Sequence, residues 1–222
     1  MKLFLNLFVA FLLARPVAAA PRYFPIGDSY TIGQSIPASG NFPNQLAQAL
    51  TLTVVANLSR TGWTSQQAID AELPAFEKAK PDFATLLIGV NDWVQRVPLP
   101  RFQRNLQILL DRMSKALPSS QRLVVLTVPD FSASFSGGQF GGGRDISAGI
   151  AAVNAVVQAE ASKRHLPCVD LFALSQAAKG KRELFADDGL HPSALQYSQW
   201  VAKMLPEARK ALQIVPVKRK AP

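Results

Sequence analysis

Short apolar runs alternate along the chain with longer stretches in which hydrophobic residues recur every three or four positions. The short runs predict strands buried on both faces, and they cover residues 23–27, 52–57, 83–88, 123–127 and 167–171. The longer stretches predict helices, because residues at that spacing share one helical face. The three clearest sets are Phe102, Leu106, Leu109, Leu110, Met113 and Leu117; Ile146, Ile150, Val153 and Val157 behind a cap at Asp145; and Ala194, Tyr197, Val201 and Met204.

Strands separated by helices predict an α/β fold, in which right-handed crossovers build a parallel sheet covered on both faces. No internal repeat or linker divides the chain, so residues 21–215 are predicted to form one domain. The glycine-rich segment "SGGQFGGGR", residues 136–144, predicts a mobile loop within that domain. The basic segment 216–222 predicts a disordered tail.

The first 20 residues have the pattern of a secretory signal peptide. Lys2 precedes an apolar run at 3–13, and small residues at 17–20 offer cleavage sites of the Ala-x-Ala type. The run is too short to span a bilayer, and no longer apolar segment follows it. The pattern therefore predicts a secreted or periplasmic protein whose mature chain has no integral membrane segment. The alternative is an uncleaved segment that anchors the protein.

Charge and cysteine content narrow the classes of partner and chemistry. Without Lys2 and Arg15, 22 basic residues remain against 15 acidic ones, a net charge of +7. The basic residues are scattered without a nucleic-acid-binding signature, which favours a solvated surface, or a loose attraction to anionic envelope components, over a nucleic-acid partner. Cys168 is the only cysteine and His165 and His191 the only histidines, so neither a disulfide nor a histidine–cysteine zinc site is expected. No nucleotide-binding motif is present, and no cofactor is expected.

Candidate chemistry follows the predicted strands. Ser29 comes after the first strand, Gly62 after the second and Asn91 after the third, while Asp188 and His191 lie in a loop before the last helix. Ligands of open parallel sheets bind beyond the carboxyl ends of the strands, so these residues are expected around one small volume. They would supply a hydroxyl, a backbone N–H, an amide, a base and a carboxylate. Taken singly, each residue is more typical of a turn, a strand end or a helix start, and only their joint occurrence after predicted strands favours a catalytic site.

The segments "GDSYTIG", Gly62, "GVND" and "DGLHP" together resemble the four ordered blocks of the SGNH hydrolases, the GDSL-type esterase and lipase superfamily. They cover most of the chain after residue 20. Tyr30 stands where the superfamily's name has leucine, at a position that varies within it. The resemblance implies a flavodoxin-like three-layer α/β/α sandwich with a central five-stranded parallel sheet. The chain has no G-x-S-x-G motif, which argues against a typical α/β-hydrolase.

The resemblance also implies a role for each site residue. Ser29 corresponds to the nucleophile, His191 to the general base, and Asp188 to the carboxylate that orients the imidazole. The backbone N–H groups of Ser29 and Gly62 and the side-chain amide of Asn91 correspond to the oxyanion hole. The implied activity is cleavage of an ester or thioester through an acyl-enzyme, without a metal or cofactor.

Substrate and acceptor stay open at the level of sequence. The acyl donor could be a small ester, a lipid or an acetylated carbohydrate, and an acyltransferase or a non-catalytic envelope-binding protein could share the same residues. Trp63 and Trp93, which adjoin the oxyanion residues, are candidates for substrate contact. Phe131, Phe135 and Phe140, which follow the fourth strand, are further candidates. All five aromatic residues could equally belong to the core.

Overall fold

The computed structural model describes residues 19–213, so the predicted signal segment and tail lie almost entirely outside the described residues. Within that range, five strands form one all-parallel sheet in the order β2-β1-β3-β4-β5. The strands are β1 (Arg22–Gly27), β2 (Thr53–Val54), β3 (Phe83–Leu87), β4 (Leu123–Leu126) and β5 (Cys168–Val169). The predicted α/β class and five-stranded parallel sheet are therefore confirmed.

The two edge strands are shorter than the sequence predicts. The apolar run at 52–57 forms only the two-residue strand β2, and the run at 167–171 forms only β5. An edge strand has a hydrogen-bonding partner on one side alone, so its ends leave the sheet easily. The central strands β1, β3 and β4 match their predicted ranges within one residue at each end.

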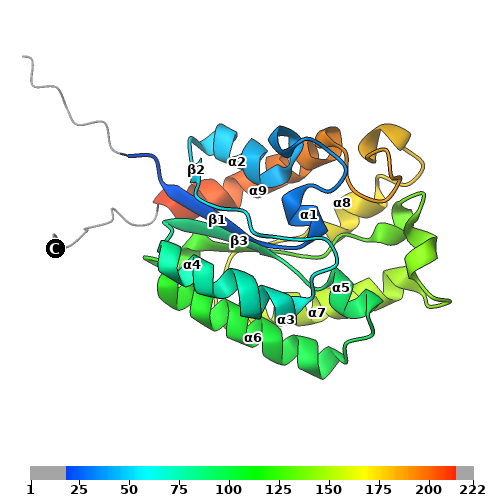
Figure 1. Cartoon of the computed structure of the whole chain (residues 1–222), viewed down its shortest axis with the longest axis horizontal. Coiled ribbons are helices and arrows are strands. Elements are labelled where there is room, and N and C mark those ends of the chain that lie inside the picture. The colour runs from blue at the N-terminus through cyan, green and yellow to red at the C-terminus, as the bar shows by residue number, and fades with distance from the viewer. Residues whose placement is uncertain (1–18, 214–222) are drawn as a thin grey trace, which may run out of the picture.

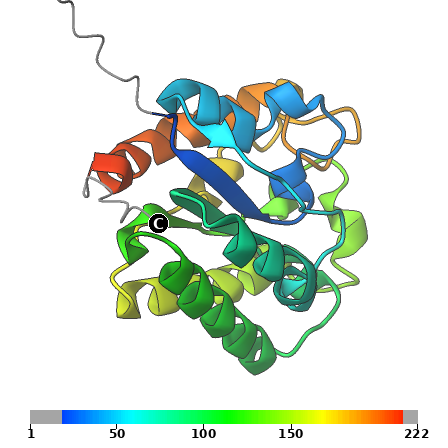
Figure 2. The same cartoon turned by 60° about the vertical axis from the view of Figure 1, so that its left-hand side comes forward.

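Helices cover both faces of the sheet and complete three layers (Figure 1). The longer ones are α2 (Phe42–Leu50), α4 (Leu73–Ala79), α6 (Leu99–Ala116), α7 (Ile146–Lys163) and α9 (Ala194–Gln213). The shorter ones are α1 (Ser29–Ile32), α3 (Ser65–Gln67), α5 (Val90–Val94) and α8 (Phe172–Gln176). Helices α2 and α9 pack together on one face, and α4, α6 and α7 form the opposite layer (Figures 1 and 2). Asp145 caps α7 as predicted, because its Oδ1 accepts a bond from the Ala148 N–H.

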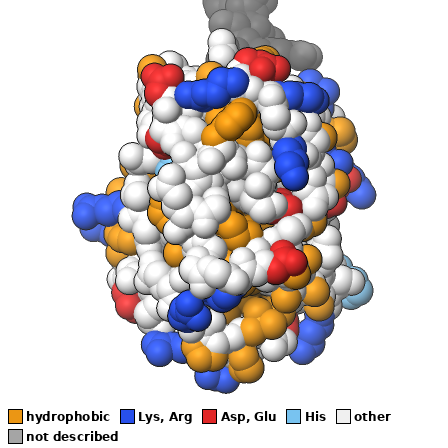
Figure 3. All heavy atoms as spheres, turned by 90° about the vertical axis from the view of Figure 1, so that its right-hand side faces the viewer, with side chains coloured by type: hydrophobic (Ala, Val, Ile, Leu, Met, Phe, Trp, Pro, Cys, Tyr) orange, Lys and Arg blue, Asp and Glu red, His pale blue; other side chains and the backbone are white. Residues whose placement is uncertain are grey.

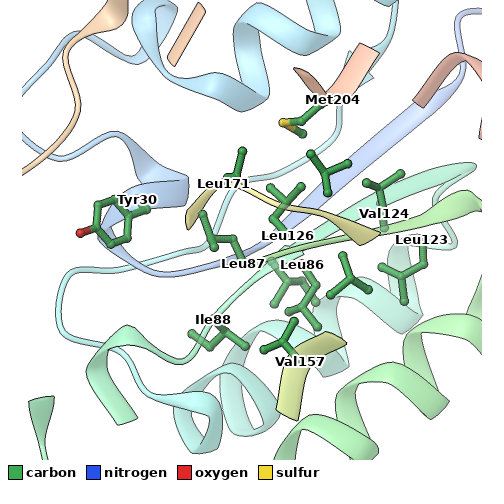
Figure 4. Packing of buried hydrophobic residues seen from close by; sticks show 14 of the residues in the cluster. Tyr30, Leu86, Leu87, Ile88, Leu123, Val124, Leu126, Val157, Leu171 and Met204 are labelled. Carbon is green, nitrogen blue, oxygen red and sulfur yellow. The ribbon is translucent and has the colours of Figure 1, made fainter. Parts of the chain in front are cut away.

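The core fills the space between the sheet and both helix layers. Every residue of β3 and β4 is buried, as their continuous apolar sequences require. In Figure 4, Met204 of α9 lies on one side of the sheet and Val157 of α7 lies on the other. None of the helices within residues 19–213 has the length and apolar character needed to cross a membrane.

Two features of the fold determine where a ligand can bind. Strand order reverses between β1 and β3, and the carboxyl ends of such neighbours form the binding crevice of open α/β sheets. Helix α9 also reaches this edge, because the Tyr197 hydroxyl donates a buried hydrogen bond of 2.8 Å to the Tyr30 carbonyl. The last helix is thus attached to the turn that follows the first strand.

Candidate active site

Ser29 lies at a sharp turn from β1 into α1. Asp28 caps this short helix by accepting a 3.0 Å bond from the Tyr30 N–H. A side chain at Gly27 would place its Cβ 2.1 Å from Thr31 Oγ1 and 2.5 Å from the Leu87 carbonyl oxygen, so only glycine fits there. Because Gly27 lies so close to Thr31 and Leu87, the chain turns sharply from the end of β1 at Gly27 to the start of α1 at Ser29. Ser29 is therefore left at the carboxyl edge of the sheet.

Asp188 and His191 form a direct pair in the loop before α9. Asp188 Oδ2 lies 2.6 Å from His191 Nδ1, and Asp188 Oδ1 accepts the N–H groups of Leu190 and His191 at 2.8 and 2.9 Å. An ionised carboxylate only accepts hydrogen bonds, so Nδ1 must carry the proton and donate it. The other ring nitrogen, Nε2, is then free to act as a base. Asp187 makes no side-chain contact with His191 that compares with this one, and its carbonyl accepts a bond from Arg182.

Hydrogen bonds keep Asp188 ionised. Burial alone would raise its pKa, but the bonds from Ser35, from the His191 ring and from two backbone N–H groups outweigh burial and lower the pKa to about 2. Asp188 therefore carries its charge throughout the physiological pH range. A permanently charged partner fixes the imidazole orientation and stabilises an imidazolium when one forms.

Ser29, Gly62, Asn91 and His191 line one pocket of about 300 Å³. The other lining residues are mostly apolar or aromatic: Tyr30, Thr61, Val90, Val94, Gln95, Phe131, Phe140 and Leu190. Figure 3 shows the face at the carboxyl ends of the strands, where hydrophobic side chains gather in the middle and lower part between scattered Lys and Arg. The sequence-predicted hydroxyl, base and amide donors therefore share one pocket with an apolar wall.

Local hydrogen bonds orient the residues predicted to form the oxyanion hole. Asn91 Nδ2 donates to the Trp63 carbonyl at 2.9 Å, which uses one of its two N–H bonds and leaves the other for a ligand. Gln95 Nε2 donates to the Gly62 carbonyl at 2.7 Å and thereby fixes the following peptide. Gly62 adopts φ +81°, a conformation that glycine reaches without strain. No sequence pattern indicates Gln95, because its role depends on a contact with a residue 33 positions away.

Only two of the five aromatic candidates line the pocket. Phe131 is buried and Phe140 is 42% exposed, and both contribute to the wall. Phe135 packs instead on Phe185 at a centroid distance of 5.6 Å. The two tryptophans lie outside the lining residues, since Trp63 stacks with Arg60 and Trp93 packs against Phe131 beneath Arg144.

The glycine-rich loop is attached to its surroundings at several points. Arg144 donates hydrogen bonds to the carbonyls of Trp93, Val94 and Gly141 at 2.8 to 3.1 Å. Ser136 donates from its backbone N–H to the Gly189 carbonyl and from Oγ to the Asp188 carbonyl. These contacts place the loop beside the Asp188 turn, and its predicted mobility stays a prediction.

Two buried carboxyl groups lie in or contact the turn that carries Ser29: Asp28 precedes Ser29, and Glu72 accepts from the Gly27 N–H. Burial raises the pKa of Asp28 from 3.8 to about 8 and that of Glu72 from 4.5 to about 8, against the opposing effect of their hydrogen bonds. Glu72 accepts bonds from the Gly27 N–H and the Ser59 hydroxyl. Both groups are mostly protonated at neutral pH. These two groups therefore add little negative charge near Ser29 to oppose an anion that forms in the pocket.

A serine on a strand-to-helix turn, an Asp–His pair and amide groups around one pocket, all at the carboxyl edge of a parallel sheet, are typical of hydrolases that use a serine nucleophile. A family model identifies the group more closely. The model of the GDSL-like lipase/acylhydrolase family matches residues 26–199. The chain therefore belongs to this family, and the predicted resemblance and esterase class are confirmed.

Solved structures of similar fold agree with this assignment. A lipase/acylhydrolase from Enterococcus faecalis is 21% identical, with a TM-score of 0.71 over 89% of this chain and 100% of its own. TesA is 21% identical, with a TM-score of 0.67 over 86% of this chain and 99% of its own. Axe2, an acetylxylan esterase from Geobacillus stearothermophilus, is 20% identical, with a TM-score of 0.66 over 85% of this chain and 94% of its own. These likenesses establish the fold alone. No curated protein matches the sequence.

Proposed function

We propose that the protein is a secreted or periplasmic esterase that cleaves acyl esters or thioesters with a Ser29–His191–Asp188 triad. The observation that carries the proposal is the 2.6 Å contact between Asp188 and His191, beside a pocket that Ser29 also lines. A carboxylate at Nδ1 makes the opposite ring nitrogen a base, which is what a serine hydroxyl needs to become a nucleophile.

The reaction proceeds in two halves. Ser29 Oγ attacks the carbonyl carbon while its proton moves to His191 Nε2, and a tetrahedral oxyanion forms. The intermediate then breaks its bond to the leaving oxygen or sulfur, which takes the proton from His191, and Ser29 is left acylated. Water attacks this acyl-enzyme with His191 again as the base, so that the acid is released and the Ser29 hydroxyl is restored.

The oxyanion is bound by the N–H groups of Ser29 and Gly62 and by Asn91 Nδ2. Asn91 is already oriented by its bond to Trp63, so little reorganisation is needed when negative charge develops. The protonated state of Asp28 and Glu72 supports the same step, because a charged carboxylate near the hole would repel the oxyanion.

The pocket favours a small acyl group. Its volume of about 300 Å³ lies at the lower end of ligand pockets, which span roughly 300 to 1,000 Å³. Val94, Phe131, Phe140 and Leu190 supply an apolar wall that suits a hydrocarbon chain better than a polar sugar. Short acyl esters are therefore the favoured substrates, and an acetylated sugar would place only its acetyl group inside.

Fluorophosphonate labelling combined with ester hydrolysis tests this proposal. Wild-type protein is expected to be labelled at Ser29 and to hydrolyse p-nitrophenyl esters, while folded Ser29→Ala does neither. Wild-type turnover by Ser29→Ala would refute the nucleophile assignment. Product analysis with an added alcohol separates the acceptors: free acid identifies a hydrolase, and a new ester as the main product identifies an acyltransferase.

Export rests on the sequence of residues 1–20 alone. N-terminal sequencing of protein from the producing cell is expected to begin at residue 20 or 21. A start at Met1 in protein from the cytosolic fraction would refute export and leave the enzymatic proposal untouched.

A further inference from the structure

Asp188 has a further partner that the triad scheme does not use. Ser35 Oγ donates a hydrogen bond of 2.6 Å to Asp188 Oδ2, the same oxygen that lies 2.6 Å from His191 Nδ1. The Ser35 bond has the length typical of a hydroxyl that donates to a charged carboxylate, and the His191 contact is short as well. Oδ1 is held separately by two backbone N–H groups, so all the side-chain contacts are concentrated on Oδ2.

Ser35 is held by the turn that carries Ser29. The Ser29 carbonyl accepts bonds from the N–H groups of Gly33 and Gln34 at 3.1 and 3.0 Å, directly before Ser35. Ser35 itself adopts φ +66°, which costs a residue with a Cβ some strain. The backbone thus accepts an unfavourable conformation at the residue whose hydroxyl reaches a partner 153 positions away.

We propose that Ser35 is a positioning residue that holds the Asp188 carboxylate in place against His191 and ties it to the turn of Ser29. This inference rests on the proposed triad. The bonds form a continuous path from the Ser29 backbone through the Gly33–Gln34 turn and the Ser35 hydroxyl to Oδ2 and on to the imidazole. Without the hydroxyl, the carboxylate keeps its two Oδ1 anchors, but Oδ2 is held only by the imidazole that it is meant to orient.

The hydroxyl also stabilises the charge on Asp188. Its bond is the largest of the contributions that lower the pKa of this carboxyl to about 2 against the effect of burial. Removal of the bond should therefore raise the pKa of Asp188. A residue that only shaped the turn would leave this pKa unchanged.

A pair of variants separates the hydroxyl from the backbone. Ser35→Gly removes the hydroxyl and its hydrogen bond to Asp188, but it also relieves the positive φ, which offsets part of the lost stability, so the protein should still fold. Its kcat is expected to fall about tenfold, equal to ~1.4 kcal/mol, with little change in KM. Ser35→Thr keeps the hydroxyl but adds a branch at positive φ, so stability should fall while the folded protein keeps near-wild-type kcat.

Carboxyl ¹³C NMR titration gives a readout that does not need turnover. The pKa of Asp188 should rise in Ser35→Gly and stay near the wild-type value in Ser35→Thr. Ser198→Ala is the matched control, because this exposed serine bonds only the Leu195 carbonyl of its own helix. That variant should change neither kcat nor the Asp188 titration.

Folded Ser35→Gly with wild-type kcat, or with an unchanged Asp188 pKa, would overturn the positioning role. Failure of the proposed function gives a different pattern. In that case wild-type protein is neither labelled by a fluorophosphonate nor active on esters, while the NMR titration still reports whether Ser35 stabilises the Asp188 carboxylate.

Discussion

The two buried carboxyl groups at the turn of Ser29 should make the protein less stable as the pH rises through neutrality. Asp28 and Glu72 have pKa values of about 8 in the folded protein, against 3.8 and 4.5 as ordinary values. Between about pH 5 and 7.5 the folded state therefore holds two protons that the unfolded state has released. Each such proton lowers the free energy of unfolding by ~1.4 kcal/mol per pH unit as the pH rises.

Two groups together give a slope of about −2.7 kcal/mol per pH unit, which is large against a typical total stability of roughly 5–15 kcal/mol. The stabilising contribution is fully present below pH 4 and is lost as the pH approaches 8. The contribution of Asp188 has the opposite sign. Its lowered pKa stabilises the folded protein above about pH 4, and this stabilisation is lost only as the pH falls below that value. Asp188 adds no slope in the measured window.

Urea denaturation at half-unit steps from pH 5.5 to 7.0 measures this slope directly. Glu72→Gln should reduce the slope by about half, whatever it does to the absolute stability. Glu77→Gln is the matched control: Glu77 is half-exposed and paired with Arg112, its pKa is lowered, and it is ionised in both states throughout the window. A flat or rising stability in wild type, or an unchanged slope in Glu72→Gln, would refute the reasoning.

Three further predictions concern the pocket. Asn91→Ala should lower kcat by about 10² or more with a smaller change in KM, and a change in KM alone would make Asn91 a substrate-binding residue. Asp188→Asn should lower kcat by on the order of 10⁴, whereas Asp187→Asn should change kcat less than about twofold. Equal losses of kcat in steady-state assays would contradict the pairing of Asp188 with His191. Phe140→Ala should lower kcat/KM for p-nitrophenyl octanoate about fivefold and leave kcat/KM for p-nitrophenyl acetate unchanged. Phe135 lies outside the pocket lining, so Phe135→Ala should change kcat/KM for neither ester. If the two variants had the same dependence on acyl-chain length, Phe140 would not belong to the acyl wall.

The sheet could be predicted because its strands are buried on both faces. Continuous, mostly apolar runs such as those of β3 and β4 are typical of strands buried on both faces, and their predicted ranges agree with the structure to within one residue. The edge strands were predicted too long, because hydrophobicity at 52–57 and 167–171 reflects packing against helices as much as pairing. The residues at the pocket could be predicted for a related reason: parallel strands bring their carboxyl ends to one edge.

Side-chain partners could not be predicted in the same way. Ser35 reaches Asp188 only because a left-handed turn aims its hydroxyl, and the sequence "GQSIP" around it has no distinctive pattern. Trp93 was a candidate for substrate contact, but it packs against α7, where a Cβ at Gly149 would lie 1.9 Å from its ring nitrogen. Whether an aromatic side chain lines the pocket or packs in the core depends on differences of a few ångströms. The spacing of hydrophobic residues along the sequence does not determine such differences.

The bond from the Tyr197 hydroxyl to the Tyr30 carbonyl joins residues 167 positions apart. The proposed nucleophile, Ser29, is also synthesised well before its proposed base, His191. A growing chain therefore carries Ser29 before it has His191, and the Tyr197–Tyr30 bond ties the helix after His191 to the turn after Ser29. A fragment that ends before α9 should therefore be unable to cleave esters, because it lacks the helix that is bonded to the turn after Ser29.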